Sequence, residues 1–241
     1  MKLKSVVSSV AVASVLAACG GGGNSSNNNG NTPGATVQSN VSTASFPIEA
    51  AASTFEQTAH SFPLSGTDST GAAYTATFAN MPDSGTTTFE GHTASSMVTT
   101  TTLSRNNVVI DTSSSRGYFQ TSPYIELGQA DLGDALYYVD DVTAPLHMPT
   151  TATVGQSGQL NDTTIYVDSS KAQVMGHQTN TWSLEADTVS TALLCNTGVY
   201  TSVSSSLDNF TEKQCLRINT SGTVLGLTVA ITSSVLTLTL Q

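Results

Sequence analysis

Apolar and polar residues alternate with a period of two over most of this chain after residue 60, and this pattern limits what the chain can fold into. Tyr74, Ala76 and Phe78 alternate with threonines, and Trp182 and Leu184 alternate with polar neighbours. Because successive side chains of a β-strand point to opposite faces, the pattern predicts half-buried antiparallel strands. Three more series have the same period: Ile165 and Val167; Leu225, Leu227, Val229 and Ile231; and Leu236, Leu238 and Leu240.

Short polar sequences separate these segments and are typical of tight turns. They are Asp68-Ser69-Thr70-Gly71, Asp83-Ser84-Gly85, Arg105-Asn106-Asn107 and Ser221-Gly222. Strand signals recur roughly every 10 to 15 residues, which predicts about eight to eleven strands. Residues 128–149 lack the alternation, so we expect a long irregular excursion there in place of core strands.

One segment before the first strand signal has helical periodicity instead. Pro47 suits the first position of a helix, and Glu49 suits its positive N-terminal end. Apolar residues then recur at a spacing of three to four and form one stripe: Ile48, Ala51, Ala52, Phe55 and Ala59. We therefore expect a mainly β protein, an antiparallel sheet curved into an open (half) barrel with this short helix against its apolar face. A two-sheet β-sandwich is the alternative.

The N-terminus has the layout of a bacterial secretion signal. Lys2 and Lys4 give a basic start, and an uncharged run rich in Val, Ala and Ser follows up to residue 18. This run is shorter than the about 20 residues that a membrane-spanning helix needs. Residues 1–18 are therefore expected to be a signal peptide that is removed.

The residues at the expected cleavage site are Leu16-Ala17-Ala18-Cys19, and they resemble the lipobox of bacterial lipoproteins. In that family the chain is cut before the cysteine, and lipid, including palmitate, is attached to it. The resemblance implies that Cys19 is lipidated and anchors the protein to a membrane of the cell envelope. Gly20 stands where an Asp would favour the inner membrane, so the outer membrane is the expected location.

Residues 19–45 are the lipid-bearing cysteine followed by Gly, Asn, Ser and Thr, with almost nothing to bury. Such a composition cannot offset the entropy of ordering, so we expect a disordered tether. The remaining residues, 46–241, suit a single β-rich domain.

The chain is acidic, with 7 Lys and Arg against 17 Asp and Glu and a net charge of −10. Cleavage before Cys19 would remove two of the seven basic residues and make the charge −12. An acidic surface argues against nucleic acid as a partner and against a basic patch on anionic lipid headgroups. The expected membrane contact is therefore through lipid alone.

Two cysteines remain once Cys19 carries lipid. Cys195 and Cys215 lie in two strand-like segments, so we expect a cross-strand disulfide in an oxidising compartment. A redox-active pair is the alternative, but these cysteines lack the Cys-x-x-Cys spacing that such pairs use.

Acidic residues offer two candidate sites for chemistry. Asp131, Asp134, Asp140 and Asp141 gather in the acidic segment 131–141, whose oxygens Ca²⁺ could accept, although a solvated loop is favoured. Glycoside hydrolysis needs a pair of carboxylates, and four residues are candidates for it. Their spacing in the sequence does not single out two of the four. The four residues are Glu90, Glu126, Asp140 and Glu185.

Other catalytic patterns are weak. Gly155-Gln156-Ser157-Gly158 lacks the Gly-x-Ser-x-Gly spacing of a nucleophile elbow and is better read as a hairpin turn. The four histidines stand too far apart in sequence for a zinc site. We therefore expect no catalytic residue, no metal and no cofactor.

Several short sequence segments after residue 86 resemble a group of uncharacterised lipoproteins from beta-proteobacteria, whose function is unknown. They are Thr87-Thr88-Phe89-Glu90-Gly91, Tyr118-Phe119, Pro123-Tyr124, Val154-Gly155-Gln156-Ser157-Gly158, Thr181-Trp182-Ser183-Leu184 and Thr191-Ala192-Leu193-Leu194-Cys195. The resemblance implies no activity. The sequence favours a non-enzymatic structural or interaction protein of the cell envelope, whose partner would be another envelope protein. The alternative is a carrier or sensor of an apolar ligand held in an open β-barrel.

Overall fold

A computed structural model describes residues 42–133, 135–143, 147–203, 209–234 and 236–241 of the chain. Cys19, the expected signal peptide and nearly all of the expected tether lie outside the described residues, and so does Asp134.

The described chain contains one helix, α1 (Ile48–Gln57), and fifteen strands. The strands are β1 (Ser45–Phe46), β2 (His60–Asp68), β3 (Ala73–Pro82), β4 (Thr87–Phe89), β5 (His92–Arg105), β6 (Val108–Thr121), β7 (Tyr124–Asp131), β8 (Tyr137–Asp140), β9 (Ala152–Thr153), β10 (Ser157–Tyr166), β11 (Val174–Ala186), β12 (Thr191–Ser202), β13 (Phe210–Asn219), β14 (Val224–Ser233) and β15 (Thr237–Leu240). Every pairing between them is antiparallel, which confirms the mainly β, antiparallel fold with one short helix.

Twelve of the strands close into a barrel, in the order β3-β2-β15-β14-β13-β12-β11-β10-β8-β7-β6-β5. The ring closes because β5 also pairs with β3, from Tyr74 opposite Arg105 to Pro82 opposite Met97. The short strand β4 pairs only with β5, while β1 and β9 form a separate two-stranded sheet. The barrel is thus closed where an open one was expected, and closure leaves no long unpaired edge.

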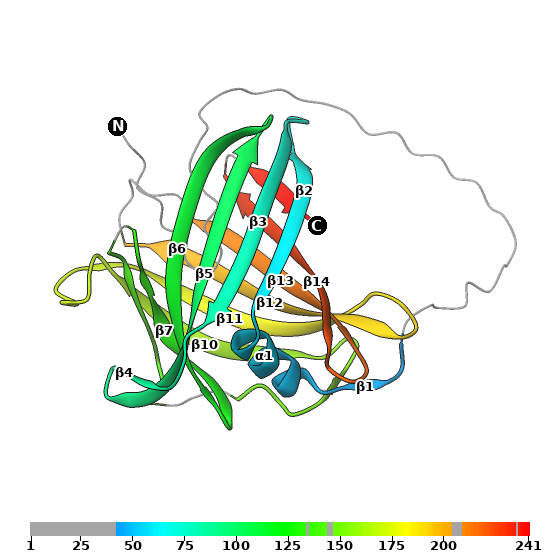
Figure 1. Cartoon of the computed structure of the whole chain (residues 1–241), viewed down its shortest axis with the longest axis horizontal. Coiled ribbons are helices and arrows are strands. Elements are labelled where there is room, and N and C mark those ends of the chain that lie inside the picture. The colour runs from blue at the N-terminus through cyan, green and yellow to red at the C-terminus, as the bar shows by residue number, and fades with distance from the viewer. Residues whose placement is uncertain (1–41, 134, 144–146, 204–208, 235) are drawn as a thin grey trace, which may run out of the picture.

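Helix α1 lies at the lower end of the barrel in Figure 1, between the steep strands β2, β3, β5 and β6 and the strands β10 to β13 that cross behind them. Its apolar stripe faces inward, with Ile48 and Ala51 fully buried and Phe55 4% exposed. Glu49 in its first turn accepts a hydrogen bond from the backbone N–H of Tyr124 at 3.0 Å, which ties the helix to β7. The helix predicted from the sequence is therefore confirmed, and it fills the lower part of the barrel interior. Ala59 was expected in the apolar stripe but lies beyond the end of the helix and is exposed.

The expected excursion over residues 128–149 is wrong in its first half, because β7 and β8 are strands of the barrel wall. Their alternation is hidden because apolar groups cover the outer face here as well. Phe89 of β4 stacks on Tyr118 at 4.2 Å between ring centroids and lies 5.3 Å from the ring of Tyr137. With both faces partly apolar, the period-two pattern that marks the other strands is lost.

The series Leu225 to Ile231 does not lie on one face throughout. Arg217 pairs with Gly226 and Ile218 pairs with Val224, so Leu225 is the extra residue of a β-bulge. A bulge shifts the side chains that follow it to the opposite phase. Leu225 is therefore 53% exposed, while Leu227, Val229 and Ile231 face the core as predicted.

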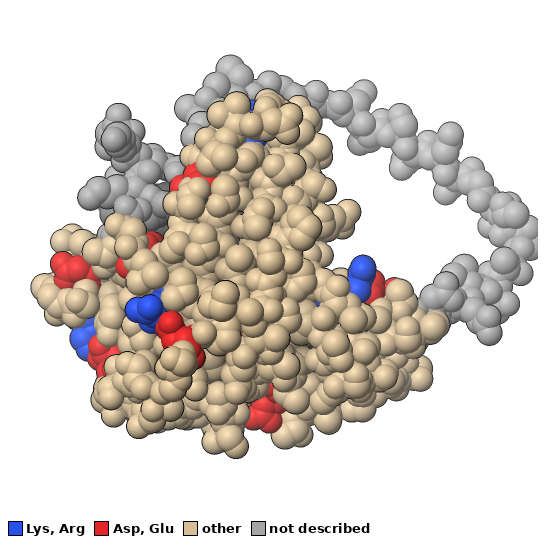
Figure 2. Space-filling view, in the orientation of Figure 1, with Lys and Arg blue, Asp and Glu red and all other residues tan. Residues whose placement is uncertain are grey.

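The outer surface carries few charges. Figure 2 shows isolated charged side chains on one face, several of them as neighbouring pairs of opposite sign, among uncharged residues. Among the described residues, no helix is both long enough and apolar enough to cross a membrane.

Candidate binding site inside the barrel

A polar cavity of about 120 Å³ lies inside the barrel, beyond the apolar layer around α1. Its wall combines carboxyl groups, amide groups and aromatic rings. The carboxyl groups come from three elements: Glu56 from the last turn of α1, Glu126 from β7 and Asp140 from the end of β8. Elements that are distant in sequence thus bring three acidic side chains to the wall of one cavity.

Asn161 of β10 holds two of these carboxyl groups together. Its Nδ2 donates to Oε2 of Glu126 at 2.8 Å and to Oδ2 of Asp140 at 2.9 Å. The hydroxyl of Thr163 donates to the other Asp140 oxygen at 2.5 Å, and the Tyr124 hydroxyl donates to Oε1 of Glu126 at 3.1 Å. Each carboxyl group is therefore fixed through both of its oxygens.

A chain of side-chain amides leads to this pair from β11. Gln178 Nε2 donates to Oδ1 of Asn180 at 2.7 Å, and Asn180 Nδ2 donates to Oδ1 of Asn161 at 2.5 Å. All donors point toward Glu126 and Asp140, so each bond polarises the next toward negative charge at that end. The amide chain is arranged to stabilise negative charge on the two carboxyl groups.

Burial works against that charge. Burial and the nearby Glu126 carboxylate raise the pKa of Asp140 to about 7. Burial also raises the pKa of Glu126, and hydrogen bonds from Asn161 and Tyr124 oppose the rise. Burial, reinforced by the charge of Glu126, raises the pKa of Glu56 to about 8. Glu56 and Asp140 therefore hold protons into the neutral pH range.

Several polar groups of the wall have no hydrogen-bond partner among the described residues. Asn196 Oδ1 and Gln129 Nε2 are both shielded from solvent and both belong to residues that line the cavity. The carboxyl group of Glu56 also accepts no hydrogen bond from the described part of the chain. Buried polar atoms are normally paired, so these groups point to an occupant of the cavity, either water or a ligand.

A smaller cavity of about 70 Å³ adjoins the first one and shares Glu56, Tyr124 and Glu126 with it. The rest of its wall is largely apolar and lies beside α1. Its apolar residues include Ala52, Met148, Leu160, Leu194 and Leu216. The barrel interior therefore changes from apolar beside the helix to polar on the other side of the three carboxyl groups.

The structure separates the four carboxylates considered for chemistry into two groups. It brings Glu126 and Asp140 together in the cavity. Glu90 pairs with Lys171, and Glu185 pairs with Lys213 at 2.7 Å, both on the outer surface.

The expected acidic loop does not form one cluster. Asp140 points into the barrel, whereas Asp141 turns to the outside and accepts hydrogen bonds from Thr143. Asp131 lies at the end of β7, where it accepts from the N–H of Gly133. Within the described ranges no three His, Cys, Asp or Glu residues are placed to hold a metal ion.

The remaining candidates have structural surroundings. Gly155 has a φ of +94° in the turn between β9 and β10, and Ser157 is the exposed first residue of β10. The predicted hairpin turn is wrong, because β9 and β10 belong to different sheets. His60 stacks between Phe55 and Phe62, with ring centroids 5.3 and 5.5 Å away. These residues do not meet at a common site.

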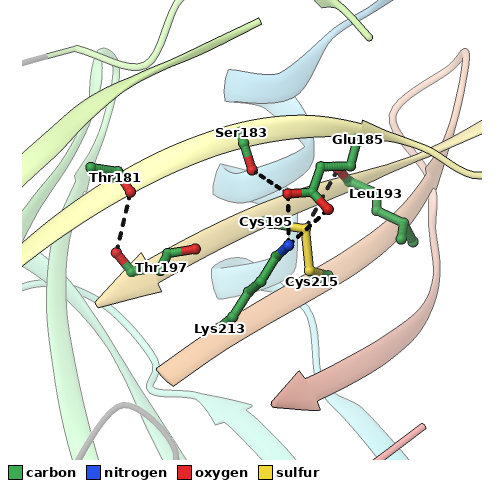
Figure 3. A network of polar contacts seen from close by, with 8 residues as sticks. All are labelled: Thr181, Ser183, Glu185, Leu193, Cys195, Thr197, Lys213 and Cys215. Atoms are coloured by element: carbon green, nitrogen blue, oxygen red, sulfur yellow. Dashed lines mark hydrogen bonds and ion pairs between the residues drawn. A yellow bond between two sulfur atoms is a disulfide. The ribbon is translucent and has the colours of Figure 1, made fainter. Parts of the chain in front are cut away.

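The predicted disulfide between Cys195 and Cys215 is confirmed, and it joins directly opposed residues of β12 and β13. Figure 3 shows Lys213 reaching both carboxylate oxygens of Glu185 beside the disulfide, and Ser183 donating to the same carboxylate. The residues next to the two cysteines in their strands face the cavity, so the cysteines themselves face outward. They are nevertheless only 1% and 6% exposed. The disulfide is therefore a covered staple on the outer side of the wall.

Sequence reasoning missed the amide groups, although a signal for them existed. Asn180 and Gln178 have the same phase in β11 as Trp182 and Leu184, which are buried. Polar residues in the phase of a buried face mark an interior polar site. Glu56 and Asn161 gave no such signal, since one lies at the edge of a helical stripe and the other follows a bulge in β10.

No family model matches this sequence, and no curated protein or solved structure matches it either.

Proposed function

We propose that this chain is a lipid-anchored, non-enzymatic interaction protein of the bacterial cell envelope that binds a small polar ligand inside its barrel. The observation that supports binding is the Asn161 amide between Glu126 and Asp140, set in an interior cavity. Burying two carboxyl groups side by side costs free energy, and folding alone gains little from it. Such a cost is typical of a functional site.

Binding is favoured over catalysis because the two carboxyl groups are held through both oxygens by neutral donors. A general acid or base needs a free path for its proton to the substrate. A fixed array of acceptors and donors is what a ligand site uses to set orientation and specificity. The absence of enzyme activity remains a prediction.

A screen with small polar molecules tests the binding role. The full chain in detergent is mixed with neutral, anionic and cationic compounds of up to about ten non-hydrogen atoms, the size that the cavity admits. The variant Gly117→Leu is the control, because a Cβ on this cavity-lining glycine has no atom within 4 Å and its side chain would occupy the space. At least one compound should raise the melting temperature of the native chain but not of the variant. If no compound does so, the binding role is wrong.

The anchoring part of the proposal is supported by the lipobox at Leu16-Ala17-Ala18-Cys19 and by the spacer-like composition of residues 19–45. A covalent lipid with two or three chains anchors stably without help from the protein surface. Growth with labelled palmitate should label the native chain and leave Cys19→Ser unlabelled. Fractionation should place the labelled protein in the outer membrane. Equal labelling of both chains would end this part of the proposal.

A carrier or sensor of an apolar ligand is the second candidate, and the apolar cavity of about 70 Å³ beside α1 is the observation that favours it. Its room is limited because Ile48, Ala51 and Phe55 already fill the interior beside that cavity. Mass spectrometry of natively purified protein tests this alternative, since a carrier should retain lipid through purification.

A further inference from the structure

We propose that the ligand of the polar cavity is a small organic cation, an alkyl amine whose ammonium group binds at Glu126 and Asp140, with Glu56 in the wall of the same cavity. This inference rests on the proposed binding function and names the chemical class of the ligand.

The first argument is charge balance. Every Lys and Arg of the described chain already has an acidic partner away from the cavity. These ion pairs are Arg105 with Asp68, Arg116 with Asp83, Lys171 with Glu90, Lys213 with Glu185 and Arg217 with Asp187. Among the described residues, no Lys, Arg or His lines the cavity. The described part of the chain therefore supplies no countercharge for the interior carboxylates, and a bound cation would supply it.

The second argument is the set of acceptors. The carboxyl group of Glu56 has no hydrogen-bond donor among the described residues, and neither has the amide oxygen of Asn196. Each carboxyl oxygen of Glu126 and Asp140 accepts one hydrogen bond, so each can accept another. An ammonium group carries three donors and no acceptor, which complements a wall of this kind.

The third argument is size and shape. A cavity of about 120 Å³ has room for roughly eight to ten water-sized groups. A bare metal ion is disfavoured, because no three metal-ligating side chains of the described chain, those of the cavity included, are placed to hold one. The rings of Phe78, Phe119 and Tyr138 line the same cavity and can pack against the methylene groups of an alkyl amine. Aromatic faces also attract a cation directly.

Proton linkage supports the same ligand class. Because burial raises the pKa of all three carboxyl groups, a cation that binds their charged forms must displace protons. Affinity should therefore rise from pH 6 to pH 8. The titratable groups that line the cavity are Glu56 on α1, Tyr118 on β6, Tyr124 and Glu126 on β7, and Tyr138 and Asp140 on β8.

Calorimetric titration of the full chain in detergent tests the inference, with putrescine as the cation and butanediol as its neutral analogue. Putrescine should bind, more tightly at pH 8 than at pH 6, and butanediol should not. Glu126→Gln should weaken putrescine binding by about 10- to 100-fold, as expected for a lost charged hydrogen bond. The matched control is Glu185→Gln on the outer surface, which should leave the affinity unchanged.

Gly117→Leu fills the cavity without removing a carboxyl group, so it keeps the test valid if Glu126→Gln fails to fold. Putrescine binding that survives Gly117→Leu would overturn the assignment of the site. Binding of a neutral or anionic compound in the cavity, with none by putrescine, would overturn the cation and leave the proposed binding function standing. If no polar compound binds, both are wrong.

Discussion

The side chain of Asn80 on β3 caps the C-terminal end of helix α1, because its Nδ2 donates a hydrogen bond to the carbonyl oxygen of Phe55 at 2.9 Å. The same nitrogen lies 3.3 Å from the carbonyl oxygen of Thr58, and Oδ1 accepts from the N–H of His60 at 3.0 Å. The last carbonyls of a helix have no partner within it, and no basic residue stands in the last turn here. The side-chain amide of Asn80 therefore holds the last turn of α1 in place. This turn carries Glu56, whose side chain lines the cavity.

Replacing Asn80 should destabilise the barrel and release the helix. Asn80→Asp keeps the shape but removes the donors and places a carboxylate against two carbonyl oxygens. Because Asn80 is 2% exposed, we expect a loss of about 1–3 kcal/mol in the free energy of unfolding, measured with denaturant. Asn80→Ala should lower the free energy of unfolding by less than Asn80→Asp does. Equal stability of Asn80→Asp and the native chain would show that the cap is not formed.

Gly198 of β12 makes room for the amide chain, which gives a second prediction. A Cβ at this position would lie 2.6 Å from Nε2 of Gln178 and 2.8 Å from Oδ1 of Asn180. Gly198→Ala should therefore break the bond between these two amides and cost about 1–3 kcal/mol, as overpacking does.

Gly226 of β14 is the matched control for Gly198, because a Cβ there has no atom within 4 Å. Gly226→Ala should leave stability unchanged or raise it slightly, since the unfolded chain loses freedom. Chemical denaturation of both variants decides the point. Comparable losses of stability in Gly198→Ala and Gly226→Ala would mean that the amide chain is not specifically affected.

Much of the fold follows from local pattern. The alternation around Tyr74, Phe78 and Trp182 marks strands of the wall, and the stripe from Ile48 to Phe55 marks the helix. Closure of the barrel has no such signal, because β3 pairs with β5 across the intervening strand β4. Pairing between distant segments depends on which edges remain free after folding, and a single sequence does not encode that locally.

The candidate site was only partly predictable for a similar reason. Glu126 and Asp140 were both recognised as carboxylates of interest, but Asn161 joins them from a third strand. Glu126 faces the cavity in the same phase as Tyr124. The bulge at Leu127, after the pair Phe119–Glu126, then turns Gln129 to the cavity as well. One irregular residue in a strand thus decides which side chains meet, and alternation cannot place it in advance.

Removal of the disulfide should lower stability while keeping the fold. In the chain-entropy model, a link between residues 20 apart contributes roughly 3 kcal/mol, so Cys195→Ala with Cys215→Ala should lose about that amount. The measurement is denaturant unfolding of the double variant beside the native chain. A reductant added under native conditions should act slowly, because the sulfurs lie under the contacts of Glu185 and Lys213. Rapid reduction without denaturant would contradict this arrangement.

Glu212 on β13 makes the pH dependence of stability testable apart from the cavity. It is 8% exposed, and no described residue hydrogen-bonds to its carboxyl group. Burial raises the pKa of Glu212 to about 8. Between the unfolded value near 4.5 and about 8, the folded chain therefore binds more protons than the unfolded chain. Stability must fall as pH rises through this window, because unfolding releases the proton that only the folded form still holds.

Glu212→Gln should remove this part of the pH dependence. At pH 4.5 the variant and the native chain should be equally stable, since both carry an uncharged side chain at this position. At pH 8 the variant should be more stable by about 2–4 kcal/mol, the free energy that such a pKa shift represents after allowance for local relaxation. Unfolding curves at several pH values give the difference directly. A variant that is less stable than the native chain at pH 8 would mean that the Glu212 carboxylate has a favourable partner, which would reverse the sign of the argument.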